Sequence, residues 1–289
     1  MAIDEILTLF PGGEILHAPA SGAIEMGGQR WYKLPTEQLT EREAALLDLL
    51  QASKQEAESY GPISDYFLSK KAPAPHLPNK LQFVHLHIWN QEISVKNVPE
   101  WLQVIADVLP NYQTAFQTSP SDIVCIVDQT FINNLAESMD GVLEALQFDF
   151  GLRMTIFIGQ VWSEVAADSL PDLFAQEAAL YKVWRQTHSQ AICIRFPKLF
   201  LWGQSQAALK LDWISNQLKR MISQQEDMDQ VIFALWEEGA VLTKAAQHLY
   251  IHRNTLQYRL DKWYEQTGLQ LKDLTDLALC YGLILDEHF

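Results

Sequence analysis

A polar run near the C-terminus, residues 253–258 (RNTLQY), brings together side chains that form paired hydrogen bonds. The guanidinium of Arg253 can donate two parallel hydrogen bonds to guanine, and the carboxamides of Asn254 and Gln257 can pair with adenine in a similar way. Three further residues flank these positions and suit contacts with phosphate groups: Thr255, Arg259 and Lys262. The chemistry that this run offers is recognition of a nucleic acid.

The same stretch has the spacing of an amphipathic helix. Its buried face is predicted from residues spaced by four and three positions, Leu256, Leu260 and Trp263. At about 100° per residue, the opposite face carries Asn254, Gln257, Tyr258 and Asp261. The pattern predicts a helix that starts at His252 or Arg253, runs to about Gln266 and ends at Gly268.

A shorter helix is predicted just before it, over residues 244–249, with Thr243 as its N-terminal cap. The pair Ala245-Ala246 would let another helix approach closely, and residues 250–252 leave room only for a tight turn. A third helix is predicted upstream, capped by Asp227 and stopped by Gly239. Two short helices joined by such a turn are typical of helix-turn-helix proteins, whose second helix enters the DNA major groove.

Charge supports this interpretation. Residues 243–262 hold four cations and one acid, which gives a net charge of +3. Because the whole chain has a net charge of −15, the other 269 residues have a net charge of −18. The predicted DNA-binding residues are Thr243, Lys244, His252, Arg253, Asn254, Thr255, Gln257, Tyr258, Arg259 and Lys262. On spacing alone, an ordinary three-helix bundle with a solvated polar face remains the alternative.

The order of residues in this region resembles a known family. The run YIHRNTLQYRL at residues 250–260, the sequence Thr267-Gly268-Leu269 and an apolar terminal helix over 277–285 closely resemble the C-terminal helix-turn-helix of the PucR family, which includes purine-catabolism and sugar-diacid regulators. The resemblance covers residues 228–285. It implies a bacterial transcription regulator that binds double-stranded DNA through a Fis-like helix-turn-helix, as a homodimer or higher homo-oligomer.

Three regions are predicted along the chain. Residues 1–78 form an accessory segment, with short strands in 14–34, a helix whose capping box is Thr40 with Glu43, and a proline-rich linker over 70–78. Residues 79–224 alternate strands and helices, and residues 225–289 form the helix-turn-helix domain. The expected fold class is an α/β N-terminal and middle region, followed by an all-α domain.

The middle region is predicted to follow the order β-α-β-β-α-β and then α-β-α, which gives a mixed sheet of the ferredoxin-like or GGDEF-like kind. The predicted strands are 81–89, 113–117, 123–127, 154–158 and 191–196, and the predicted helices are 99–109, 131–148, 170–185 and 207–222. A related resemblance, to the degenerate GGDEF domains of PucR-type regulators, rests on this order and on the run Ile158-Gly159-Gln160-Val161.

Catalytic residues are not expected. The turn over 118–122 (TSPSD) lacks the glycines of a working diguanylate cyclase, and Asp122 alone cannot make a two-metal site. His85 and His87 share one face of a predicted strand, but no third metal ligand is identifiable. We therefore expect neither a metal nor another cofactor, and we expect that the chain is not an enzyme.

The remaining features favour a cytoplasmic protein. No signal peptide or membrane span is evident, and Cys125, Cys193 and Cys280 lie far apart in apolar runs, which predicts buried, reduced thiols. Residues 1–222 would sense an unknown small molecule or a partner. The alternative hypothesis is a metabolite-binding or enzymatic module whose C-terminal helices serve oligomerisation.

Overall fold

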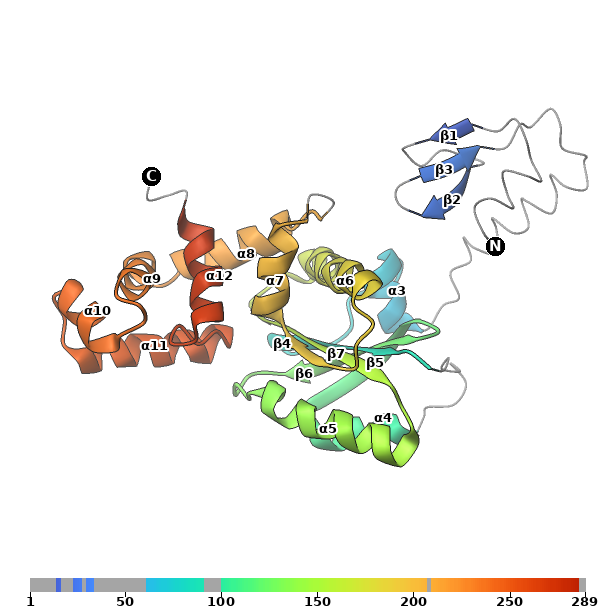
Figure 1. Cartoon of the computed structure of the whole chain (residues 1–289), viewed down its shortest axis with the longest axis horizontal. Coiled ribbons are helices and arrows are strands. Elements are labelled where there is room, and N and C mark those ends of the chain that lie inside the picture. Colours follow the sequence, from blue (N-terminus) through green and yellow to red (C-terminus); the bar gives the residue numbers. More distant parts are fainter. Residues whose placement is uncertain are drawn as a thin grey trace, which may run out of the picture. The chain divides into compact units, whose positions relative to one another are not determined.

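The protein is described here from a computed structural model, which covers residues 14–16, 23–27, 30–33, 61–90, 100–206 and 209–285. The chain divides into two compact units, Met1–Ser59 and Tyr60–Phe289 (Figure 1). The helix predicted to start at Thr40 lies outside the described residues. The division at residues 78 and 224 stays a prediction.

The first unit contains a small antiparallel sheet. Its strands are β1 (Glu14–Leu16), β2 (Ala23–Gly27) and β3 (Arg30–Lys33), in the order β1-β3-β2. Tyr32, at the centre of the middle strand, is buried. The prediction of short strands within residues 14–34 is confirmed.

The second unit is built on a five-stranded sheet in the order β5-β6-β4-β7-β8. Its strands are β4 (Lys80–Ile88), β5 (Tyr112–Ser119), β6 (Asp122–Asp128), β7 (Met154–Ser163) and β8 (Cys193–Arg195). Strand β8 runs parallel to β7, whereas the other pairs are antiparallel. The predicted mixed sheet is confirmed, and so is the predicted order of strands and helices from β4 to β8.

Helices cover both faces of this sheet (Figure 1). One face packs against α4 (Glu100–Val108) and α5 (Leu135–Phe150), and the other against α3 (Pro62–Ser69) and α6 (Leu170–Thr187). Because side chains alternate along β4, Val84 and Leu86 enter the first core, while Phe83 lies in the second. His85 shares the α6 face and is buried, where it contacts Glu177.

Several predicted boundaries were wrong. Helix α5 begins at Leu135 instead of 131, because Asn134 accepts a hydrogen bond from the Ala136 amide and caps the helix there. Strand β7 continues to Ser163 instead of ending at 158, and β8 is shorter than predicted. The helix predicted over 207–222 begins only at Asp212.

The rest of the second unit is helical, which confirms the all-α part of the expected fold class. An unpredicted helix, α7 (Phe196–Gln204), is followed by α8 (Asp212–Ser223), α9 (Met228–Glu237), α10 (Leu242–His248), α11 (Arg253–Thr267) and α12 (Leu274–Ile284). The terminal helix therefore starts three residues before the predicted position, where Asp273 accepts hydrogen bonds from the amides of Thr275 and Asp276. None of the described helices is long and apolar enough to cross a membrane.

A bulge in β7 places a buried carboxylate at the centre of this unit. The register of β7 against β4 shifts so that Gly159 and Gln160 lie between the pairs Val84–Ile158 and Gln82–Val161. The carboxylate of Glu177, on α6, accepts hydrogen bonds from the Gln160 amide at 3.2 Å and from the Trp162 indole at 3.0 Å. It also lies 3.1 Å from His85 Nε2, and it is fully buried.

Only glycine fits at position 159. A Cβ there would lie 2.0 Å from Glu177 Oε1 and 2.8 Å from the Phe83 carbonyl oxygen. We predict that Gly159→Ala lowers the free energy of unfolding by about 3 kcal/mol, because neither the backbone nor the buried carboxylate can move away at low cost. Urea unfolding followed by circular dichroism measures this change.

The matched control is Gly141→Ala, in α5, where an added Cβ meets nothing within 4 Å. This variant should be neutral or raise the free energy of unfolding by up to about 1 kcal/mol, because alanine favours a helix. Equal effects at the two positions would contradict the close approach of Glu177 to the bulge.

Candidate nucleic-acid interface

Helix α11 forms as the spacing predicts. His252 is its N-cap and accepts a hydrogen bond from the Asn254 amide at 3.2 Å, and Gly268 ends the helix with a positive φ of 69°. The predicted inner face is confirmed, because Leu256, Leu260 and Trp263 are all buried. The leucines therefore fix which side of α11 meets the protein.

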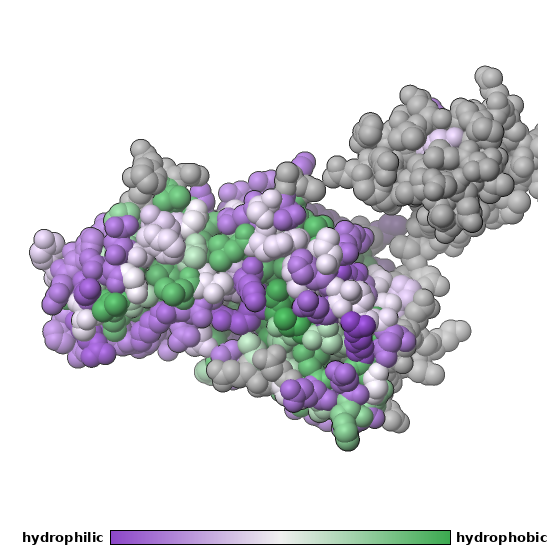
Figure 2. Space-filling model, in the orientation of Figure 1, coloured by the Kyte–Doolittle hydropathy of each residue, from purple (hydrophilic) through white to green (hydrophobic). Residues whose placement is uncertain are grey.

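The opposite side of α11 is polar and accessible. Figure 2 shows hydrophilic residues along this part of the surface. The predicted DNA-binding residues that are exposed here are His252, Arg253, Asn254, Thr255, Tyr258 and Lys262, while Gln257 and Arg259 are half-buried. Tyr258 contributes a large aromatic ring to this face, and 69% of its surface is exposed.

The carboxamide of Gln257 is engaged on both sides. Its Nε2 donates to Asp261 Oδ1 at 2.5 Å, and its Oε1 accepts from Lys272 Nζ at 2.7 Å. Gln257 must exchange these partners before it can bond a base edge. Lys272 follows the end of α11, so the helical spacing could not have associated it with this face.

Helix α10 packs closely, as its alanines predict. Ala245 and Ala246 are buried, and α10 contacts both α9 and α11. Thr243 and Lys244, both predicted DNA-binding residues, are exposed on its first turn. Tyr250, in the turn before α11, is 96% exposed with a left-handed φ of 54°, and the helical spacing predicted no role for it.

One predicted cap was wrong, and a second occupies its predicted position without a capping bond. Helix α10 starts at Leu242 with Val241 as its N-cap, because Ala240 in a left-handed conformation has already turned the chain, and Thr243 lies inside the helix. Asp227 occupies the N-cap position of α9, but its own φ of 53° is left-handed and its side chain makes no capping bond. Its carboxylate lies 3.9 Å from the Arg259 guanidinium instead.

The C-terminal end of α11 docks on the sheet. The last carbonyl groups of a helix lack partners within the helix. Here the Thr267 carbonyl accepts from Gln160 Nε2 at 2.6 Å, the Gln266 carbonyl from Ser163 Oγ at 2.8 Å and the Glu265 carbonyl from Lys80 Nζ at 2.8 Å. The N-terminal end of the helix, with Arg253 and Asn254, therefore extends away from a fixed C-terminal end.

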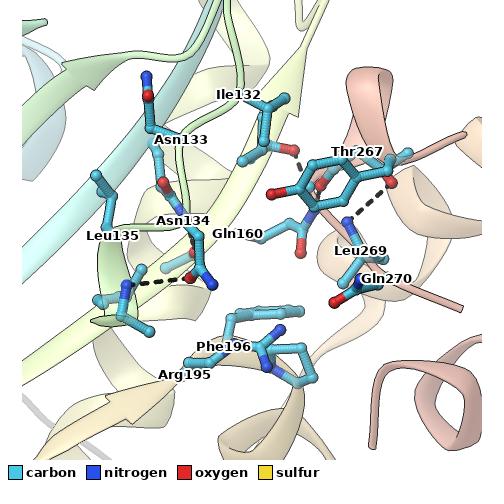
Figure 3. Close-up of a pocket in the computed structure, with 18 residues that line it drawn as sticks. Ile132, Asn133, Asn134, Leu135, Gln160, Arg195, Phe196, Thr267, Leu269 and Gln270 are labelled. Carbon is cyan, nitrogen blue, oxygen red and sulfur yellow. Dashed lines mark hydrogen bonds between the residues drawn. The ribbon is translucent and has the colours of Figure 1, made fainter. Parts of the chain in front are cut away.

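An ion pair completes this contact. Arg195 donates to both carboxylate oxygens of Asp276, at 3.0 and 2.8 Å, and the Gln270 amide donates to one of them. Asp276 is fully buried, and burial raises the pKa of its carboxyl. A polar cavity of about 70 Å³ lies beside the pair, where Gln160 and Arg195 of the α/β layers face Thr267 and Gln270 (Figure 3).

Other candidate sites are less developed. Within the described residues, no group of three His, Cys, Asp or Glu side chains is arranged to hold a metal ion. All three cysteines are free, as predicted, and Cys125 and Cys280 are buried, whereas Cys193 is half-buried. Burial raises the pKa of the Cys125 thiol to about 12.

A short packed helix, a tight turn and a longer helix with an exposed polar face define a helix-turn-helix protein. Residues 230–281 match the PucR C-terminal helix-turn-helix domain. The chain therefore carries the helix-turn-helix domain of the PucR transcription regulators. The predicted resemblance to these regulators and the predicted fold class are confirmed.

Similar proteins cover most or part of the chain. A "Leucine-rich protein" of Streptococcus dysgalactiae subsp. equisimilis is 32% identical over 263 residues, covering 89% of this chain and 90% of its own. The "Carbohydrate diacid regulator" of Escherichia coli is 36% identical over 88 residues, covering 28% of this chain and 23% of its own. A solved regulator of polyketide synthase expression from Bifidobacterium adolescentis is 16% identical, with coverage of 72% of this chain and 79% of its own, and has a TM-score of 0.31.

The close packing of α10 against its neighbours leads to a second prediction. Ala246→Leu adds volume to a fully packed position and should lower the free energy of unfolding by about 1–3 kcal/mol. Gln247→Leu, at the exposed neighbouring position, is the control and should change it by less than about 0.5 kcal/mol. Thermal unfolding of both variants measures the difference, and an unaffected Ala246→Leu protein would mean that α10 does not pack as described.

Proposed function

We propose that this chain is a sequence-specific DNA-binding transcription regulator that inserts α11 into the major groove. The observation that supports this most is the division of α11 into a buried leucine face and an exposed face with Arg253 and Asn254. This exposed face belongs to residues 243–262, which carry a net charge of +3 in an acidic chain. Local positive charge is what phosphate contacts require.

Each proposed contact follows from its chemistry and position. Arg253, Asn254 and Gln257 would recognise base edges, with Tyr258 beside them. The residues at the flanks would contact phosphates: Thr243, Lys244, His252, Thr255, Arg259 and Lys262. His252 holds the start of the helix as well, so its substitution would affect both helix stability and DNA binding.

We further propose that the protein acts in the cytoplasm as a homodimer and that a small molecule or a partner controls it through residues 1–222. One recognition helix contacts only a short half-site, and a dimer places two helices about 34 Å apart on the DNA. The contact of α11 and α12 with β7 and Arg195 supports such control, because a change in the α/β layers would reach α11 directly. The proposed role is binding, without catalysis.

A mobility-shift assay on the full chain tests this function, with DNA obtained by selection from random sequences. We expect one preferred site, bound more weakly as salt rises. Arg253→Ala should cost roughly 1–3 kcal/mol on that site and relax its specificity, because a bidentate contact with guanine is lost. Lys262→Ala should weaken all sequences equally and lower the salt slope by about one unit.

Lys198→Ala is the matched control, since Lys198 is exposed on α7, outside the predicted interface. It should leave affinity and specificity unchanged. Failure of the selection to enrich any sequence would contradict the proposal and favour a module whose C-terminal helices serve oligomerisation. An Arg253→Ala protein with unchanged specificity would contradict the assigned docking of α11.

A further inference from the structure

A cavity of about 430 Å³ lies on the α6 side of the sheet, away from the DNA-binding helices. It opens between α6, α3, strands β4 and β6, and the turn before Asp122. This volume lies within the range of sites that hold small organic ligands. It is several times larger than the polar cavity beside Arg195, which has about 70 Å³.

The inner part of this cavity is apolar. The rings of Phe67, Phe174 and Tyr181 line it, together with Val124 of β6 and the buried ring of His85. On the side of α6, the cavity is lined by three alanines, whose small side chains leave it open: Ala175, Ala178 and Ala179. An apolar body of aromatic or aliphatic character therefore fits against the sheet.

The rim of the cavity is charged, and most of its charge is paired. Arg185 donates to both carboxylate oxygens of Asp122, which also accepts from Ser119 and lies 2.8 Å from His87 Nδ1. Burial alone would raise the pKa of the Asp122 carboxyl, but the hydrogen bonds from His87, Arg185 and Ser119 hold it well below its usual range. The charge of Arg185 is thus balanced by a permanent carboxylate.

Lys182 is different. It lies one helical turn after Ala178 and lines the same rim, and its ammonium group has no ion pair or hydrogen bond with any residue that the structure describes. Among the described residues of the cavity wall, it is the cation whose charge is not balanced. A ligand with a single negative charge would balance it.

We propose that this cavity binds a small monocarboxylate with an apolar body, the carboxylate on Lys182 and the body against Phe174 and Tyr181. A phosphate ester or a dicarboxylate fits less well. Its second negative charge would lie on the same rim as the Asp122 carboxylate, and the described residues of the cavity wall offer no second unpaired cation to balance it.

The position of this site connects it to α11, and this part of the inference rests on the proposed regulatory function. His85 lines the cavity and contacts Glu177, whose other oxygen accepts from the Gln160 amide. The side chain of the same Gln160 donates to the Thr267 carbonyl at the end of α11. A ligand that moves His85 therefore acts on a continuous set of hydrogen bonds that ends at the DNA-binding helix.

Ligand binding is tested on the full chain without DNA, by ligand-observed NMR titration. The probes are 3-phenylpropionate and octanoate, each compared with its neutral primary amide. We expect each acid to bind about tenfold more tightly than its amide, and Lys182→Gln to remove this preference. Lys198→Gln is the matched control and should keep it, because Lys198 is exposed on another helix.

A second variant tests the location without changing charge. Ala179→Leu fills the cavity from an exposed position of α6, so the chain should fold, and it should abolish binding of both acids. The proposal is overturned if neither acid binds, if acid and amide bind alike, or if Lys182→Gln or Ala179→Leu binds the acids as the unmodified chain does.

The effect on DNA is measured separately. Adding 3-phenylpropionate should change the affinity for the selected site at least about threefold in the unmodified chain and not in Lys182→Gln. If the acid binds but DNA affinity does not change, the ligand site stands and its coupling to α11 is refuted. If no DNA sequence is selected at all, the proposed function fails while the NMR result is unaffected.

Discussion

The buried carboxylate of Glu177 is the interaction on which the second unit depends. No lysine or arginine among the described residues forms an ion pair with it, so the hydrogen bonds from Gln160 and Trp162 and the contact with His85 must compensate for its removal from water. Those partners come from two strands, and Gly159 makes room for the carboxylate between them. The same bulge turns the Gln160 side chain toward Thr267, so the packing of α6 on the sheet and the docking of α11 are set together.

Helix α11 combines three constraints that suit a DNA-binding element. Its leucines are buried in the core to which α9, α10 and α12 also contribute, its last carbonyls are bonded to the sheet, and its first turn is left in solvent. Gly268 contributes to the docking of α11 in two ways. Its positive φ ends the helix, and the absence of a side chain allows close contact with the sheet, since an added Cβ would lie 2.8 Å from Val161 Cγ2. A helix held in this way keeps Arg253 and Asn254 exposed on an already ordered turn, which suits the proposed contact with DNA.

The sequence predicted those parts of the structure that depend on local periodicity. Strand β4, helix α6 and the two faces of α11 follow from spacing, and the fold class follows from the order of such elements. Helix α7 was missed because most of its residues are apolar and continue an apolar strand, so Pro197 at its start is the main local sign of the change. The contacts of Gln257 with Lys272 and of Arg195 with Asp276 join residues 15 and 81 positions apart, and no local pattern encodes them.

The most direct test of this account is site-specific photocrosslinking of the full chain bound to its selected DNA site. A benzophenone side chain introduced at Tyr258, which is 69% exposed on the outer face of α11, should crosslink to bases of that site. The same group at Phe148, which is 90% exposed on α5, should not crosslink. Crosslinking from Phe148 and none from Tyr258, on DNA that the chain demonstrably binds, would contradict the assignment of α11 as the recognition helix.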